Sequence, residues 1–559
     1  MDWKQVRLTV AIVILSLGLC LPVYAEKPWH KFVYFQNWGG LNDNLSLTEI
    51  ADNEATTIQN VIFDTGGAIK KRFGFDAIPN DIVQKVATGT TVAITGLAFF
   101  EEDGGDRQIV AITNNDSKAT AMKKDYGVGG GLESGAWNNI DNIQLPSSYS
   151  NNDLPDFAVA EDKLVFTVPA PIQTTPFVYT GGDDKTVKLT IDSDCPVAEV
   201  VEYHKNHLFL AGNDSFPSRV YFSALDDITD YTATDFFDVQ TSDGSRVRAL
   251  ISAYNSLYIF KDSSIWRLSG AERDTFILEK LVSNIGTLSN QSVAIVNNFI
   301  YFVTSQNDIA VYDGAYKVQF ISQKIRNTIG GLNFTRAQYA LGLPFSTYKY
   351  VDHDYYCSVS DAGSGENNTV LLFDTAFSAW TKFKGITANA WVVAEDSLGQ
   401  NLMIFGDYDG YVHSYPSSSY YDANVATAPT LGFYEVTSSI SAFYQTKWFK
   451  YSDLALEDKY WRLLKTYALS ETDGSTLSVE VKTDYEASGS VLSIDLSESG
   501  SLWDVALWDV DFWSGAGLRI ERDEINEGKD MFQVRYSNNT VNEGFTILGW
   551  ELYIEPTVR

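Results

Sequence analysis

Residues 207–225 read HLFLAGNDSFPSRVYFSAL. A short apolar run leads into a polar turn and then into a second strand-like run, a pattern typical of two antiparallel strands. The same strand–turn–strand pattern recurs along the chain, beginning at Arg107, Asp162, His207, Ser256, Phe299, Val370 and Leu402. The mean spacing is about 49 residues, which is close to the length of one four-stranded blade of a β-propeller.

A sheet of this size cannot bury both of its faces alone, so a ring of such sheets, each packed against its neighbours, explains the repeat. The spacing is uneven and predicts six to seven blades. An array of β-sandwiches is the alternative that the pattern also allows. No long stretch shows sustained 3.6-residue apolar periodicity, so we predict an all-β protein.

The pattern changes after Pro416, where a polar loop gives way to long alternating segments. Val479 and Val481, and later Val534 and Tyr536, alternate with polar residues in the manner of half-buried antiparallel strands. We therefore predict four parts: a signal-peptide-like leader at 1–25, an N-terminal strand and hairpin segment at 26–85, a β-propeller at 86–430 and a C-terminal β-sandwich or jelly-roll-like domain at 431–559.

The composition indicates a folded protein with an acidic surface. The chain has 559 residues and a formal net charge of −31, yet only 20% of its residues are charged while 45% are hydrophobic. This balance excludes an acidic disordered chain. It also argues against tight, nonspecific binding of nucleic acid over the whole surface, although it does not exclude DNA passing nearby.

The first residues resemble a secretory signal peptide. Lys4 and Arg7 precede an uncharged apolar run at 8–21, and Ala25 ends a small-x-small cleavage pattern. A membrane anchor is the rival interpretation, but the apolar run is short for a span. Two cysteines remain beyond this segment, Cys195 and Cys357, and the sequence leaves open whether they are paired.

No catalytic or metal-binding motif is present in the sequence. We find no nucleophile elbow, phosphate-binding loop, dinucleotide fingerprint or zinc-protease motif. Paired carboxylates for glycoside hydrolysis stay open, because 72 acidic residues guarantee accidental pairs. We therefore predict a protein that is not an enzyme and that has no catalytic residue, metal or cofactor.

Two clusters are candidate interaction sites. Lys70, Lys71 and Arg72 form the densest basic cluster, on a predicted hairpin, and are either a solvated strand edge or a tip that docks on an acidic neighbouring subunit. The second cluster is an aromatic loop in the C-terminal domain, which either packs in the core or binds a partner subunit or a sugar ring. Its members are Trp503, Trp508 and Trp513.

Four stretches of the sequence together resemble one protein family. Residues 38–75 read WGGLNDNLSLTEIADNEATTIQNVIFDTGGAIKKRFGF, with Gly-Gly-Leu-Asn, an apolar stretch, a glycine turn and a basic Arg-x-Gly. Together with 217–270 and the stretches that begin at KYWRLLKTYALSETDG and LWDVALWDVDFW, this order is similar to the propeller-containing nozzle (tail-hub, tubular) proteins of short-tailed bacteriophages.

The resemblance implies a structural, non-enzymatic virion protein of the viral tail. Such proteins form a homo-oligomeric ring, six copies in such tails, that attaches to portal and adaptor proteins and to tail fibres. Double-stranded DNA passes through the ring during genome ejection, and an acidic channel lets it slide without sequence-specific binding. The leader departs from this family. The leader-like segment instead favours an alternative, a secreted or periplasmic β-propeller that binds or hydrolyses glycans.

Overall fold

The structure is a computed structural model. It describes residues 30–35, 38–64, 66–78, 85–125, 136–141, 148–169, 174–182, 185–189, 194–333, 341–345, 354–395, 401–428, 432–450, 459–471, 474–497 and 517–556. The leader predicted at 1–25 lies outside these residues, as do Trp503, Trp508 and Trp513.

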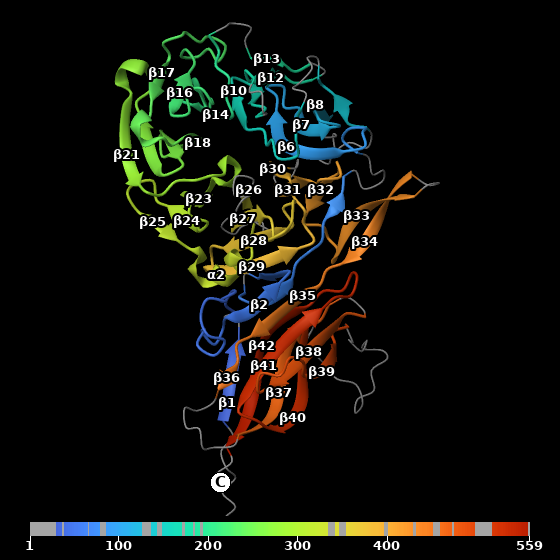
Figure 1. Ribbon diagram of the computed structural model, residues 1–559. Helices are drawn as coiled ribbons and strands as arrows, with labels where there is room; N and C mark the ends of the chain where they lie inside the picture. The colour runs from blue at the N-terminus through green and yellow to red at the C-terminus, as the bar shows by residue number, and fades with distance from the viewer. Residues whose placement is uncertain are drawn as a thin grey trace, which may run out of the picture.

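The fold is all-β, as the sequence predicted, with 54% of the described residues in strands and 4% in helices. Within the described residues, seven four-stranded antiparallel sheets follow one another in a ring, and an elongated body of longer strands lies beneath them (Figure 1). The predicted β-propeller with a C-terminal β-sandwich is thus confirmed, and the described part of the propeller has seven blades.

The blades form in chain order. The first blade contains β6 (Val92–Glu101), β7 (Arg107–Asn115), β8 (Lys118–Asp125) and β9 (Asn138–Asn139), and the second contains β10 (Phe157–Ala160), β11 (Lys163–Phe166), β12 (Phe177–Tyr179) and β13 (Val187–Lys188). The third blade contains β14 (Val200–His204), β15 (His207–Ala211), β16 (Arg219–Phe222) and β17 (Phe236–Asp238). The fourth contains β18 (Val247–Ala253), β19 (Ser256–Lys261), β20 (Ser264–Ser269) and β21 (Ile277–Ser283).

The fifth blade contains β22 (Ala294–Val296), β23 (Phe299–Val303), β24 (Ile309–Tyr312) and β25 (Val318–Phe320). The sixth contains β26 (Leu341–Phe345), β27 (Asp354–Val359), β28 (Thr369–Asp374) and β29 (Ala379–Lys384). The seventh contains β30 (Ala390–Glu395), β31 (Asn401–Gly406) and β32 (Val412–Tyr415) and is completed by β5 (Asp76–Ala77). Short helical turns connect some of these strands, namely η1 (Thr241–Asp243), η2 (Arg273–Thr275), η3 (Asn290–Ser292), η4 (Ser322–Ile325) and α2 (Arg326–Gly330).

The ring is closed by a strand from the other end of the propeller sequence. β5 precedes the first blade in the chain, yet it pairs with β32 as the outermost strand of the seventh blade, His413 lying opposite Ala77. A blade completed by residues from both ends of the ring links the first and last blades through backbone hydrogen bonds, which resists opening of the ring.

The sandwich consists of two six-stranded sheets. One contains β1 (His30–Phe35), β3 (Val61–Phe63), β4 (Ile69–Lys71), β37 (Lys459–Leu469), β40 (Leu518–Gly528) and β42 (Thr546–Pro556). The other contains β2 (Ala55–Gln59), β35 (Ala442–Thr446), β36 (Phe449–Lys450), β38 (Thr476–Thr483), β39 (Ser490–Asp495) and β41 (Met531–Asn538). Strands β1–β4 from the N-terminal segment are therefore part of the sandwich sheets.

The N-terminal segment also ties the sandwich to the propeller. The backbone N–H of Leu41 donates to the carbonyl of Trp380 in β29 (2.8 Å), and a Cβ at Gly40 would lie 2.4 Å from the Trp380 nitrogen. Only glycine permits this close approach. One hydrophobic cluster runs without interruption from the sandwich, through Trp461 and Trp550, to Tyr301 and Tyr355 of the fifth and sixth blades. The two parts therefore share a core.

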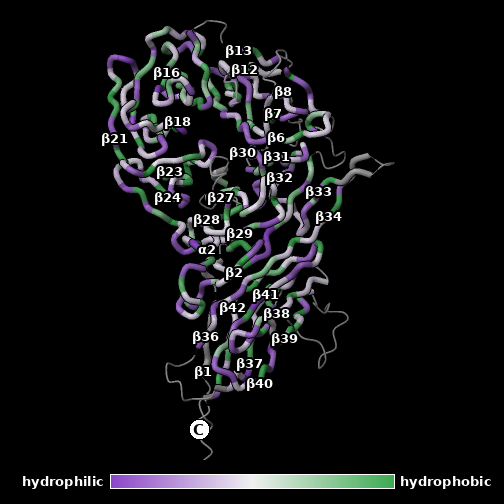
Figure 2. The backbone as a smooth tube through the Cα atoms, in the orientation of Figure 1, coloured by the Kyte–Doolittle hydropathy of each residue, from purple (hydrophilic) through white to green (hydrophobic). Residues whose placement is uncertain are grey.

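Between propeller and sandwich, β33 (Tyr421–Ala428) and β34 (Gly432–Ser439) form a two-stranded hairpin that projects sideways (Figure 1). Hydrophobic and hydrophilic residues are mixed along the strands (Figure 2). Cys195 and Cys357 are buried thiols in different core clusters and are not joined by a disulfide. No helix in the described part of the chain has the length and apolarity needed to cross a membrane.

Candidate ligand cavities at the propeller axis

The structure places two of the three predicted basic docking residues inside the protein. Lys71 and Arg72 have 0% of their surface exposed. The Lys71 ammonium donates to Asn538 Oδ1 (2.7 Å) and to the Glu543 carbonyl (2.8 Å), and burial lowers its pKa to about 8. The prediction that this cluster is an exposed docking tip is therefore wrong for Lys71 and Arg72.

Arg72 instead holds three parts of the chain together. Its guanidinium forms a two-pronged ion pair with Asp422 of β33, through Nη1–Oδ1 (2.8 Å) and Nη2–Oδ2 (2.7 Å). It also donates from Nε to Asn60 Oδ1 (3.0 Å) and from Nη2 to the carbonyl of Lys384 in the sixth blade (2.9 Å). Lys70 is half-buried, its ammonium 4.6 Å from the centre of the Phe73 ring.

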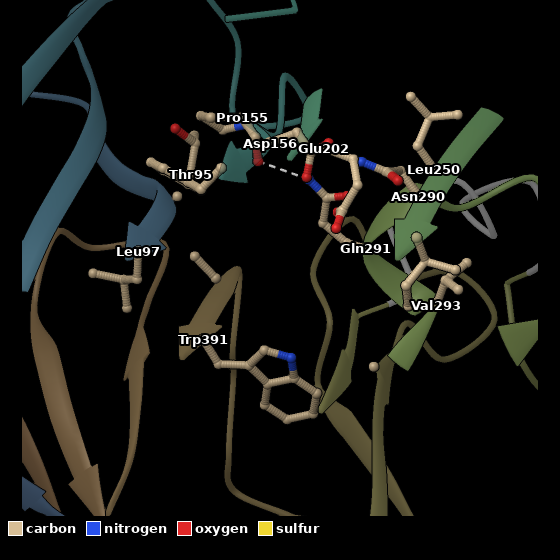
Figure 3. A pocket seen from close by; sticks show the side chains of 15 residues that line it. Thr95, Leu97, Pro155, Asp156, Glu202, Leu250, Asn290, Gln291, Val293 and Trp391 are labelled. Atoms are coloured by element: carbon tan, nitrogen blue, oxygen red, sulfur yellow. Dashed lines mark hydrogen bonds between the residues drawn. The ribbon is translucent and has the colours of Figure 1, made fainter. Parts of the chain in front are cut away.

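A cavity of about 230 Å³ lies on the propeller axis, and all seven blades contribute to its wall. The contributing segments are the innermost strands β6, β10, β14, β18, β22, β26 and β30, or the residues just before them. We call this space the axial cavity (Figure 3). Part of its wall is apolar and includes Leu97, Leu250 and Val293, while the polar groups come from Asp156, Glu202, Asn290, Gln291 and Trp391.

Close packing of the blades shapes this wall. A Cβ at Gly96 of β6 would lie 2.8 Å from Phe157 and 3.0 Å from Pro155, so the absence of a side chain lets the first two blades meet. Thr95, next to it, donates its hydroxyl to the Ile112 carbonyl (3.2 Å) within the first blade. Of the polar groups of the wall, Glu202 and Trp391 are carried on strands, while Asp156, Asn290 and Gln291 lie just before the innermost strands of their blades.

Two carboxyl groups, those of Asp156 and Glu202, line the axial cavity. Asp156 Oδ2 accepts the backbone N–H of Val201 (2.9 Å), and Glu202 Oε1 accepts that of Ser252 (3.2 Å). Burial raises the pKa of Asp156 to about 6, with the hydrogen bonds acting in the opposite direction. Burial, and then the negative charge of Asp156, raise the pKa of Glu202 to about 8. Both carboxyl groups therefore hold their protons more strongly than exposed carboxyl groups do, and Glu202 more strongly than Asp156.

The indole N–H of Trp391 faces the axial cavity without a hydrogen-bond partner. Trp391 lies in β30 and is 8% exposed, and among the described residues no acceptor lies within hydrogen-bonding distance of its nitrogen. Figure 3 shows that this nitrogen points into the space between the indole ring and Gln291. A buried donor of this kind costs free energy unless an acceptor reaches it. The cavity wall therefore contains a buried donor that no described group satisfies.

A second cavity, also of about 230 Å³, lies beside the first. It is lined by Asn152, Asp153, Leu154, Pro169, Glu199, Val200, Arg248, Leu288, Asn290 and Gln291, so it shares Asn290 and Gln291 with the axial cavity. We call it the outer cavity. Arg248 forms an ion pair with Asp262 (2.6 Å), and burial raises the pKa of Asp153.

The sequence did not identify any of these residues. The carboxyl groups of Asp156 and Glu202 lie in separate repeats, so no local motif joins them. One signal was present: Glu202 is an acidic residue inside the apolar segment Val200–His204, which forms the innermost strand of its blade. Among the described residues no group of three or more His, Cys, Asp or Glu side chains is arranged to hold a metal ion.

Comparisons with known proteins find similar solved structures, all at low sequence identity. No known family and no curated protein matches the sequence. Among solved structures, the chain is similar to the Pan2 WD40 domain of Neurospora crassa, at 10% identity over 62% of this chain and 96% of that one, with a TM-score of 0.35. It is also similar to an exo-β-1,3-galactanase from Phanerochaete chrysosporium, at 7% identity over 84% of this chain and 100% of that one, with a TM-score of 0.25.

These comparisons correct one prediction. The lack of a catalytic motif led us to predict that the chain is not an enzyme, but glycoside hydrolases are among the structures to which it is similar. A propeller needs no local motif for catalysis, because side chains from separate blades meet at its axis. The exclusion of enzymatic activity is therefore withdrawn. The resemblance to phage tail proteins stays a prediction that no comparison tests.

Proposed function

We propose that the chain is a β-propeller that binds a glycan in its axial cavity. The observation that carries the proposal is the buried Trp391 N–H, which faces the cavity and has no acceptor among the described residues. A sugar hydroxyl supplies that acceptor, and the same hydroxyl groups hydrogen-bond to carboxyl and amide groups such as those of Glu202 and Gln291.

The mixture of groups on the wall supports a glycan over a purely apolar or a strongly charged ligand. Leu97, Leu250 and Val293 provide apolar surface for the C–H groups of a sugar ring, while the polar groups lie close to them on the same wall (Figure 3). Binding pockets commonly combine apolar walls with a few fixed polar groups that set ligand orientation. A secreted or periplasmic location, which the leader-like residues 1–25 predict, agrees with a glycan ligand.

A glycan array with the purified full chain tests this proposal. We expect the wild-type protein to bind a defined set of glycans, and Trp391→Phe, which keeps the ring but removes the N–H donor, to bind them more weakly. The matched control is Glu395→Gln, which changes an exposed carboxyl group at the far end of the same strand, β30. Equal binding by wild type and Trp391→Phe, or no binding by the wild type, would contradict the proposal.

A second candidate is the ring-forming tail protein that the sequence resemblance implies. It is favoured by the role of the segment that carries the resemblance, since residues 38–75 join propeller and sandwich through Gly40 and Arg72. A rigid two-part subunit with a net charge of −31 suits a ring whose channel conducts DNA. Portal and adaptor proteins, tail fibres and five further copies of the chain would be its partners.

Mass photometry and electron micrographs of the purified protein separate the two candidates. Closed rings without glycan binding support the tail protein, and a monomer that binds glycans supports the glycan-binding propeller. Because Lys71 and Arg72 are buried, charge reversal there is expected to disrupt the subunit itself and is not a test of ring assembly.

A further inference from the structure

The register of the inner strands places the two cavities one after the other along the propeller axis. At three of the inner strands, the residue that lines the outer cavity comes earlier in the chain than the residue that lines the axial cavity. The pairs, outer residue first, are Leu154 and Phe157 at β10, Val200 and Glu202 at β14, and Arg248 and Leu250 at β18. The inner strands of a propeller run in the same direction around its axis. The outer cavity therefore lies towards the end where these strands begin.

Asn290 and Gln291 lie at the boundary between the cavities. They are shared by both linings, with Leu288 before them in the outer cavity and Val293 after them in the axial cavity. The spacing at β14 gives a scale, because Glu199 of the outer cavity, just before the strand, and Glu202 of the axial cavity, within it, are three residues apart, about 10 Å in extended chain. The two cavities, each of about 230 Å³, are therefore separated by a short distance along the axis.

The side chain of Gln291 crosses this boundary. It extends from η3 before the fifth blade, and its Nε2 donates to the carbonyl of Pro155, before the second blade, at 2.7 Å (Figure 3). Pro155 lines the axial cavity and its neighbour Leu154 lines the outer cavity, so the hydrogen bond lies between the two. A ligand hydroxyl can replace a single hydrogen bond of this type, because its net contribution to stability is small.

We propose that the two cavities are consecutive subsites of one elongated site, and that the Gln291 side chain is the partition that a ligand displaces to occupy both. The ligand class is a linear, hydroxyl-rich chain, one unit of which lies beside Glu202 and Trp391 and the next beside Asp153 and Arg248. This inference rests on the proposed glycan-binding function for its ligand, but the partition itself is a property of the protein and is tested without a glycan.

Crystals of the wild type and of Gln291→Ala, soaked in triethylene glycol, test the partition. We expect the linear probe to span both cavities in Gln291→Ala and to stop at Gln291 in the wild type. Gln291→Ser serves in the same way if the alanine variant does not fold, and Glu395→Gln is the control that should match the wild type. If the probe occupies the same volume with and without the Gln291 side chain, the partition is refuted.

The outcomes separate this inference from the proposed function. A continuous probe in Gln291→Ala together with a glycan array that shows no binding overturns the proposed function and keeps the partition. If the wild type binds glycans but the two cavities remain divided in Gln291→Ala, the proposed function stands. The proposal that the two cavities are consecutive subsites of one site is then overturned.

Discussion

Replacing Arg72 by alanine tests how the propeller is held to the sandwich. All five N–H groups of an arginine side chain can donate, and Arg72 makes five hydrogen bonds, two of them to Asp422 and the others to Asn60, Phe73 and Lys384. The side chain is 0% exposed and its partner Asp422 is 3% exposed. The substitution therefore leaves a buried carboxylate and buried carbonyls without their donor.

We expect Arg72→Ala to lower the free energy of unfolding by about 3–5 kcal/mol, the range for removing one partner of a buried ion pair. Arg72→Lys should recover only part of this loss, because an ammonium group has three donors and no planar fork. The control is Arg267→Ala, which removes the partly exposed ion pair with Glu279 and should cost about 0–1 kcal/mol.

Urea denaturation followed by tryptophan fluorescence measures these differences, and hydrogen exchange locates them. Faster exchange is expected first at β33 and at the end of β29, which contact Arg72. If Arg72→Ala is no more destabilising than Arg267→Ala, the role of Arg72 as an internal link is refuted.

Three further predictions follow from the described contacts. Gly96→Ala should lower the free energy of unfolding by about 1–3 kcal/mol, because its Cβ would lie 2.8 Å from Phe157, whereas Gly104→Ala, with no atom within 4 Å, should have little effect on the same urea midpoint. Burial raises the pKa of Glu202 from 4.5 to about 8, so the wild type should lose stability as the pH rises between these values. Glu202→Gln should remove the part due to this group, at most about 5 kcal/mol, in denaturation curves recorded at several pH values. The part due to Asp156, whose pKa is raised to about 6, should remain. Trp391→Phe should weaken glycan binding by about fivefold to tenfold in calorimetric titrations and leave the urea midpoint unchanged or slightly raised, since it removes one unsatisfied buried donor.

The fold was predictable because its signal is local. Strand–turn–strand patterns such as His207–Ala211 followed by Arg219–Phe222 depend on residues a few positions apart, and the repeat adds the ring. What the pattern did not reveal is the closure by β5, whose two residues, Asp76 and Ala77, are too few to show periodicity. Nor did it reveal that β2–β4 belong to the sandwich, because strand pairing over several hundred residues leaves no local trace.

The candidate site was not predictable for a related reason. Asp156, Glu202, Gln291 and Trp391 come from four different blades, and only the closed ring brings them to one cavity. The basic cluster was misinterpreted because charge in a sequence predicts exposure, whereas Lys71 and Arg72 are buried and matched by internal acceptors.

The most direct test of the glycan-binding proposal is a crystal structure of the full chain with the oligosaccharide that binds best on the array. We predict electron density for the sugar in the axial cavity, with a hydroxyl oxygen within hydrogen-bonding distance of the Trp391 indole nitrogen and others at Glu202 and Gln291. A sugar bound elsewhere on the protein, with none in the axial cavity, would contradict the account.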